Sequence, residues 1–337
     1  MDLCKNIIRK VESVNALPID MISKERSALM GFAILWVVIF HYGLAMPFTI
    51  ISYLGFTGVD IFIFLSAYGL VRSMSKNPSV ISFYLRRLKR IFPSYLIIGL
   101  IATLFLYRDG VAGYLYRFST IGFWTNGMYY DWYIPSIVAL YILFPMIYHY
   151  TQSESNKKGI IIFVLIIYSI ALYHTIDVSK IDNPHFLMLY RSPLFILATC
   201  PFIIRGNIKK WLFYSIVGFA IFFILALVFV ITLEIRFLYF STTFLTPIIL
   251  IVLSFLFFRI NLLHTVCGFL GKYSLEIYIV FMLIYYLLKN YGLPYRDEFY
   301  NITSILLLMI TIVGGVFLKT VVDFIIKIIN ESISYRC

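Results

Sequence analysis

The stretch GFAILWVVIFHYG, at residues 31–43, decides the fold class because it is almost entirely apolar and carries a single histidine, His41. It belongs to an apolar segment of about 28–46, and a helix needs about 20 largely apolar residues to cross a bilayer. The same character runs through all 337 residues, of which 61% are hydrophobic and 13% charged. Soluble domains are about half apolar and about a quarter charged. The sequence therefore predicts an all-α, polytopic membrane helical bundle.

Ten apolar segments of this kind follow one another along the chain, so we expect about ten transmembrane helices. They cover about 28–46, 52–71, 91–107, 132–148, 159–175, 186–204, 210–231, 238–258, 267–288 and 302–325. With both termini in the cytoplasm, about three quarters of the 28 lysines and arginines fall in cytoplasmic segments, which is the positive-inside pattern. We therefore expect a cytoplasmic basic tail at 1–27, a transmembrane domain at 28–326 and a cytoplasmic tail at 327–337.

Two ionisable side chains inside these segments are candidate functional groups, because such residues are costly within a membrane. Asp60 follows the outer end of the second segment by about eight residues, roughly 12 Å, and His41 lies roughly 8 Å below the same face. The two groups are therefore expected at similar depth on neighbouring antiparallel helices. A carboxylate that orients an imidazole is a general-base arrangement. A histidine that serves packing alone and a satisfied buried ion pair are the structural alternatives.

A basic segment, FYLRRLKRIFP at residues 83–93, lies on the expected cytoplasmic face. Such a run usually marks topology and anchors lipid headgroups, so the net charge of +12 indicates a membrane-lipid partner and no nucleic acid. Arg86, Arg87 and Arg90 also recur at helical spacing and present forked donors suited to a phosphorylated ligand. Glu276 is expected to pair with Lys272 or Arg259 and to have no catalytic role.

A metal site is not expected. The acidic and histidine residues of one outer loop fit no zinc pattern, and a polar loop is the preferred interpretation. These residues are His174, Asp177, Asp182 and His185.

His41, the run GVDIFIFLS at 58–66 and the basic segment together resemble acyltransferase family 3, in order and in spacing. These are bacterial integral-membrane enzymes that commonly O-acetylate surface carbohydrates. Weaker similarities follow at 131–145, 193–195 and 271–278. The resemblance implies a multi-pass protein of the bacterial cytoplasmic membrane, with acetyl-CoA as the acyl donor and a carbohydrate as the acceptor. It matches His41 to the essential histidine of the family, and Arg87 and Arg90 to its Arg-x-x-Arg motif.

The chain departs from the family pattern at three positions. Met30 stands where the family usually has a basic residue, and Arg26, one helical turn earlier, could replace that residue by reaching up. Ala67 stands where the family usually has glycine, and Phe281 where it commonly has a histidine.

The resemblance and the residues together suggest one mechanism. The donor phosphates would rest on Arg26, Arg86, Arg87 and Arg90. The thioester would then reach His41, about 22 Å along the helix from Arg26. His41 would act as base or transient acyl carrier, with Asp60 orienting it.

Three other interpretations stay open at this point. A transporter or flippase of lipid-linked sugars would use His41 and Asp60 as an intramembrane polar path. A polysaccharide polymerase or ligase would be expected to carry a larger outer loop. An inactive family member is consistent with Met30. The acyltransferase hypothesis leads because it explains His41 and the arginines together, while the acceptor, the acyl group and the oligomeric state stay open.

Overall fold

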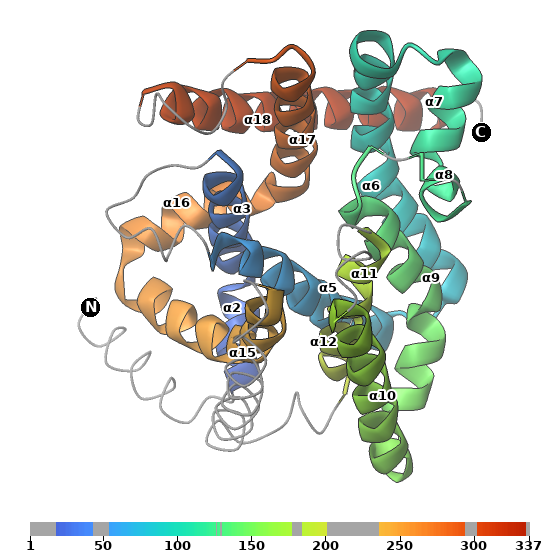
Figure 1. The fold of residues 1–337 in the computed structure, drawn as a ribbon, viewed down its shortest axis with the longest axis vertical. Coiled ribbons are helices and arrows are strands. Elements are labelled where there is room, and N and C mark those ends of the chain that lie inside the picture. Colours follow the sequence, from blue (N-terminus) through green and yellow to red (C-terminus); the bar gives the residue numbers. More distant parts are fainter. Residues whose placement is uncertain are drawn as a thin grey trace. The chain divides into compact units, whose positions relative to one another are not determined.

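A computed structural model describes residues 18–42, 54–125, 127–128, 130–176, 184–200, 236–293 and 302–334. Every regular element in these ranges is a helix, so the all-α prediction is confirmed there (Figure 1). The chain forms two compact units. Unit 1 consists of Met1–Met30, Val59–Arg72 and Leu143–Phe269, and unit 2 consists of Gly31–Gly58, Ser73–Ile142 and Leu270–Cys337.

Four helices in the described part are long and apolar enough to cross a membrane. They are Leu54–Lys76, which joins η1 (Leu54–Phe56) to α5 (Thr57–Lys76); Val80–Tyr107, which joins α6 (Val80–Ala102) to the π-helix η2 (Thr103–Tyr107); α9 (Tyr133–Thr151); and Ile302–Ser332 of α18 (Ile302–Ser334). A fifth exists if α15 (Arg236–Arg259) and α16 (Asn261–Lys272) form one broken span, with a bend of 119° between them. These helices overlap the second, third, fourth, eighth and tenth expected segments.

Other expected segments differ from the helices that the structure contains. The described part of the segment 186–204 contains two helices, α11 (Pro184–Leu189) and α12 (Ser192–Leu197), because the chain turns at Tyr190 and Arg191 and Pro193 opens a new helix. The segment 267–288 breaks at Tyr273, between α16 and α17 (Ser274–Asn290). Helix α18 continues to Ser334, past the expected end of the last span.

The remaining segments complete this picture. The first contains α3 (Arg26–Tyr42), a 17-residue apolar helix that follows α2 (Pro18–Lys24). The fifth contains α10 (Lys157–Ile176). The segment 210–231 and the first 17 residues of the basic tail lie outside the described residues. The loop between α6 and α9 carries two short helices, α7 (Gly110–Phe118) and α8 (Ile121–Thr125).

Unit 2 is organised around α17. The residues from Glu276 to Leu283 are all buried, and α17 packs against both α18 and α6. Its apolar side chains at nearly every position explain why it is enclosed on several sides, since a helix with one apolar stripe would bury one face only. Helix α17 therefore contacts both the helix with the basic segment and the helix that holds the C-terminal part of the chain.

Candidate functional site

His41 lies in the last turn of α3, and its Nδ1 atom is 2.8 Å from the carbonyl oxygen of Val37, one turn earlier. A carbonyl oxygen only accepts hydrogen bonds, so Nδ1 carries the hydrogen. The neutral imidazole then has its lone pair on Nε2. A histidine in this tautomer can accept a proton at Nε2, which is the chemistry that a general base requires. The backbone of α3 thus orients the ring.

Aromatic rings surround the imidazole of His41 in unit 2. The ring centroids of Phe40 and Phe281 both lie 5.0 Å from that of His41, and the centroid of Tyr285 lies 6.0 Å away. Phe281 and Tyr285 come from α17. Phe281 is also the position at which the resemblance leads us to expect a histidine, so in this chain a phenyl ring borders His41 there.

Tyr42, the residue after His41, is tied to α18. Its hydroxyl is hydrogen-bonded to that of Thr311 at 2.8 Å, and its carbonyl oxygen accepts from the hydroxyl of Ser304 at 3.2 Å. The last turn of α3 therefore contacts two helices, α17 through the His41 ring and α18 through Tyr42.

Asp60 is fully buried in α5 and forms an ion pair within unit 1. Its Oδ1 atom accepts a hydrogen bond from Arg191 Nε at 2.9 Å. Arg191 also donates to the hydroxyl of Tyr190 at 2.5 Å and stands over that ring at 4.6 Å. Sequence reasoning missed Arg191 as a site residue. The signal for it was an arginine inside an otherwise apolar segment, which calls for a buried acidic partner.

The pairing of Asp60 with His41 stays a prediction, because the described contacts give each group a different partner. In unit 2, an added Cβ at Gly58, two residues before Asp60, would lie 2.6 Å from the carbonyl oxygen of Ala33. Ala33 precedes His41 by eight residues, or about 12 Å of helix. The start of α5 therefore packs against α3 two turns below the histidine, and only glycine allows this approach.

Arg26 lies at the first residue of α3 and packs on α5 within unit 1. Its Nε atom donates to the carbonyl oxygen of Leu65 at 3.3 Å. A Cβ at Gly69 would lie 2.9 Å from a terminal nitrogen of the same guanidinium, so Gly69 provides the space in which Arg26 lies across α5. The guanidinium therefore lies over Gly69, one helical turn after Leu65 on α5. Helix α3 continues without a break from Arg26 past Met30.

The three arginines of the basic segment lie on α6 in unit 2, the same unit as His41, and each is held differently. Arg86 makes a long contact of 3.5 Å with the hydroxyl of Ser73, while the Arg87 guanidinium stands 5.9 Å from the ring centroid of Phe83. Arg90 forms a two-point contact with Glu276. The expected helical arrangement of these cations is therefore present, and one of the three is already paired with an anion.

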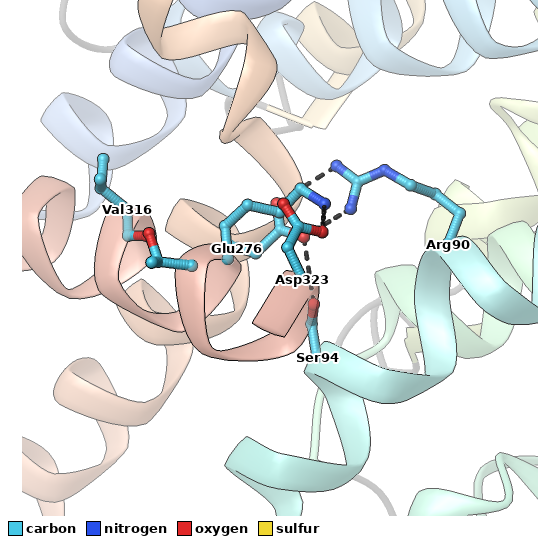
Figure 2. A network of polar contacts seen from close by, with 7 residues as sticks. Arg90, Ser94, Glu276, Val316 and Asp323 are labelled. Carbon is cyan, nitrogen blue, oxygen red and sulfur yellow. Dashed lines mark hydrogen bonds and ion pairs between the residues drawn. The ribbon is translucent and has the colours of Figure 1, made fainter. Parts of the chain in front are cut away.

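Glu276, in the first turn of α17, is the anion that holds Arg90. Its Oε1 and Oε2 atoms accept from Arg90 Nη1 at 2.5 Å and Nη2 at 3.2 Å, and Ser94 donates to Oε1 at 3.1 Å (Figure 2). The expectation that Glu276 pairs with Lys272 or Arg259 was wrong. The first turn of α17 packs against α6, so the nearest cation comes from the basic segment.

Asp131 forms a second buried polar cluster in unit 2. It precedes α9, and its Oδ1 atom accepts from the backbone N–H of Ile134 at 2.7 Å and from the hydroxyl of Tyr278 at 3.2 Å. Burial raises the pKa of the Asp131 carboxyl from 3.8 to about 6. Asp131 thus acts as the cap of α9 and as a polar contact between α9 and α17.

No cluster of three or more potential metal ligands occurs among the residues that the structure describes. Two members of the acidic loop considered for a metal, Asp177 and Asp182, lie outside those residues.

Comparisons with known proteins identify the family of the chain. Residues 28–322 match the family described as "Acyltransferase domain", Acyl_transf_3. Over 284 residues, the chain is 25% identical to "Putative acetyltransferase ORF330" of Acidianus two-tailed virus, a match covering 79% of the chain and 84% of that relative. No solved structure matches the chain. The match over most of its length, together with an oriented histidine and an arginine-bearing helix in one unit, shows that the chain belongs to acyltransferase family 3.

Proposed function

We propose that this acyltransferase moves an acetyl group from cytoplasmic acetyl-CoA to a hydroxyl of a surface or lipid-linked carbohydrate. The observation that carries the proposal is the hydrogen bond from His41 Nδ1 to the Val37 carbonyl, which places the imidazole lone pair on Nε2. The family match supports acyl transfer over transport, and the name of the viral relative supports acetyl as the acyl group.

His41 acts as the base in the simpler version of this reaction. Nε2 takes the proton of the acceptor hydroxyl as its oxygen attacks the thioester carbonyl, and the C–S bond breaks. The sulfur of coenzyme A leaves as a thiolate and receives the proton from the imidazolium. In the alternative version, Nε2 attacks the thioester itself, the C–S bond breaks and coenzyme A leaves as a thiolate. The acceptor hydroxyl then displaces the acetyl group from Nε2, and its proton passes by way of Nε2 to the thiolate. Both versions need the same tautomer.

The arginines supply the donor site in this proposal. Guanidinium forks bind phosphate oxygens in a bidentate manner, and acetyl-CoA carries several phosphate groups. Arg86, Arg87 and Arg90 belong to the unit that contains His41, which supports their assignment to the donor. Arg26 is assigned to the same ligand because it lies on the helix that leads to His41.

Asp60 is proposed to stabilise the imidazolium that forms during transfer. Its Oδ2 atom is buried and takes no hydrogen bond from the residues described, so this atom would serve that role. The ion pair with Arg191 reduces the negative charge that Asp60 can offer, and a structural role for the carboxylate is therefore the competing interpretation.

The topology that we propose has ten spans with both termini in the cytoplasm, in a bacterial cytoplasmic membrane. The distribution of lysine and arginine supports it. This topology puts the basic segment on the side that contains acetyl-CoA and the end of α3 near the opposite face. The donor would then enter from the cytoplasm and the carbohydrate from outside.

Membrane vesicles that contain the protein test the proposal when supplied with acetyl-CoA labelled in its acetyl group. Alkali-labile label should accumulate in the carbohydrate or lipid-linked carbohydrate fraction, and His41→Ala should abolish it. His149→Ala is the matched control, because His149 is an exposed histidine in the last turn of α9. Equal labelling with and without the protein would contradict the proposed function.

A further inference from the structure

We propose that Glu276 is a positioning residue for the transfer reaction. By holding Arg90, it fixes the donor-binding segment of α6 to the helix that borders His41. This inference rests on the proposed function, in which Arg90 contacts the donor. It adds a residue that neither the family match nor the sequence patterns single out for a role.

The first observation is how Glu276 holds the guanidinium. A guanidinium has five N–H donors, and the carboxylate takes one from each Nη nitrogen, at 2.5 and 3.2 Å. Three N–H donors therefore remain. The Arg90 side chain is 37% exposed while that of Glu276 is 0% exposed, so the pair has a closed side and an open side. Arg90 can receive a phosphate at its open side while Glu276 keeps its orientation fixed.

The second observation is that the carboxylate is itself fixed. Ser94 follows Arg90 by one turn on α6 and donates to the same Oε1 atom, at 3.1 Å. In Figure 2, Arg90 and Ser94 point from one helix toward Glu276 on the other. A buried carboxylate is costly unless it is paired and hydrogen-bonded. Glu276 therefore binds α6 through two residues, and Arg90 has a single favoured orientation.

The third observation connects this pair to the histidine. Glu276 and Phe281 lie on the same helix, five residues apart, or about 7.5 Å along its axis. The Phe281 ring lies 5.0 Å from that of His41. Helix α17 thus contacts the donor segment through Glu276 and the candidate base through Phe281. A change in the Arg90–Glu276 contact would therefore weaken the hold of α6 on the donor without touching the base itself.

The expected effect follows from these contacts. In Glu276→Gln, Arg90 loses its charged partner and can leave the orientation in which it meets a phosphate. We expect the KM for acetyl-CoA and the Kd for coenzyme A to rise about tenfold, as for the loss of one charge-assisted contact, with kcat changed less than about threefold. Arg90→Ala should have the same effect. The double variant should be no worse than either single one, because both substitutions remove the same interaction.

The experiment uses the full-length protein in lipid nanodiscs. Coenzyme A binding is measured by titration calorimetry, and thiol release from acetyl-CoA gives KM and kcat. The variants are Glu276→Gln, Glu276→Asp, Arg90→Ala and the double variant. Glu331→Gln is the matched control, since Glu331 is an exposed carboxylate on α18 that pairs with Lys327. Glu276→Asp keeps the charge and should recover part of the affinity, whereas Glu331→Gln should bind like the wild type.

A purely structural ion pair predicts different results. If Glu276→Gln folds and binds coenzyme A like the wild type, the positioning role is wrong. If that variant does not fold, Glu276→Asp takes its place, because aspartate keeps the charge and leaves Arg90 present but has a side chain one methylene shorter. A folded Glu276→Asp protein that binds coenzyme A more weakly than the wild type supports the proposal, and wild-type binding by it overturns the proposal. If the wild type neither binds coenzyme A nor releases it from acetyl-CoA, the proposed function itself fails.

Discussion

Asp131→Asn is predicted to remove a pH dependence from the stability of the protein. The Asp131 carboxyl is fully buried before the start of α9, where it accepts from Ile134 N–H and from the Tyr278 hydroxyl. Burial raises its pKa from 3.8 to about 6, because the charged form loses its hydration. Asparagine keeps an oxygen acceptor for both contacts but carries no charge at any pH. The substitution thus resembles the protonated wild type.

The sign of the effect follows from proton binding. Between about pH 4 and pH 6 the folded protein holds the Asp131 proton while the unfolded chain has released it. The wild type therefore loses stability as pH rises through this interval, and the loss is complete above it. A pKa that differs by one between the folded and unfolded states changes the free energy of unfolding by about 1.4 kcal/mol, so the rise of the Asp131 pKa to about 6 corresponds to about 3 kcal/mol. Asp131→Asn should be more stable than the wild type by up to that amount at pH 7, and no more stable at pH 4.

Thermal unfolding of both proteins in detergent micelles, from pH 4 to pH 8, measures this difference. The gap between their melting temperatures should widen from pH 4 to pH 6 and then stay constant. Glu331→Gln controls for a general loss of negative charge, because the Glu331 side chain is 57% exposed. A difference in melting temperature that does not change with pH, or that narrows as pH rises, would refute the argument that burial disfavours the charged form of Asp131.

Two further predictions concern unit 1. Arg191→Leu should lower the free energy of unfolding by about 3–5 kcal/mol, because it leaves the Asp60 carboxylate buried without its cation. The double variant Arg191→Leu/Asp60→Leu should recover most of that loss. Thermal unfolding measures both variants, and a double variant no more stable than the single one would contradict the prediction. Gly69→Val should displace the Arg26 guanidinium and raise the KM for acetyl-CoA as much as Arg26→Ala does. Adding Gly69→Val to Arg26→Ala should then cause no further rise, and an additive effect in kinetic assays would exclude the shared cause.

The fold class could be predicted from the sequence because apolar composition is a property of whole segments. The helix ends were harder. The break at Tyr273 lies among Gly271, Lys272, Ser274 and Glu276, which interrupt the apolar run and were not used as a boundary signal. At the turn of Tyr190 and Arg191, the partner of Arg191 is Asp60, 131 residues away in the sequence. Hydropathy reports the length of an apolar segment and is insensitive to a bend within it. The predicted segment ends therefore differ from the helix ends in the structure where tertiary contacts determine the path of the chain.

The candidate site shows the same division. His41 and the basic segment were identified because ionisable residues stand out against an apolar background. Their partners could not be identified, because ion pairing depends on which helices pack together and on which of their surfaces are in contact. Glu276 was assigned to cations near it in the sequence, whereas its partner Arg90 comes from α6. The Nδ1 contact of His41 with Val37 also could not be predicted, since every helical histidine has a carbonyl one turn earlier and only the rotamer decides whether it is used.

The most direct test of acetyl transfer by His41 is the ester content of the surface carbohydrate, measured by NMR in a strain that lacks the gene. The strain is complemented with wild type, His41→Ala or His149→Ala at matched abundance in the membrane. Our account predicts that wild type and His149→Ala restore the acetyl ester and that His41→Ala does not. Full restoration by His41→Ala would show that the histidine is structural, and a deletion that leaves the acetyl content unchanged would contradict the proposed acceptor class.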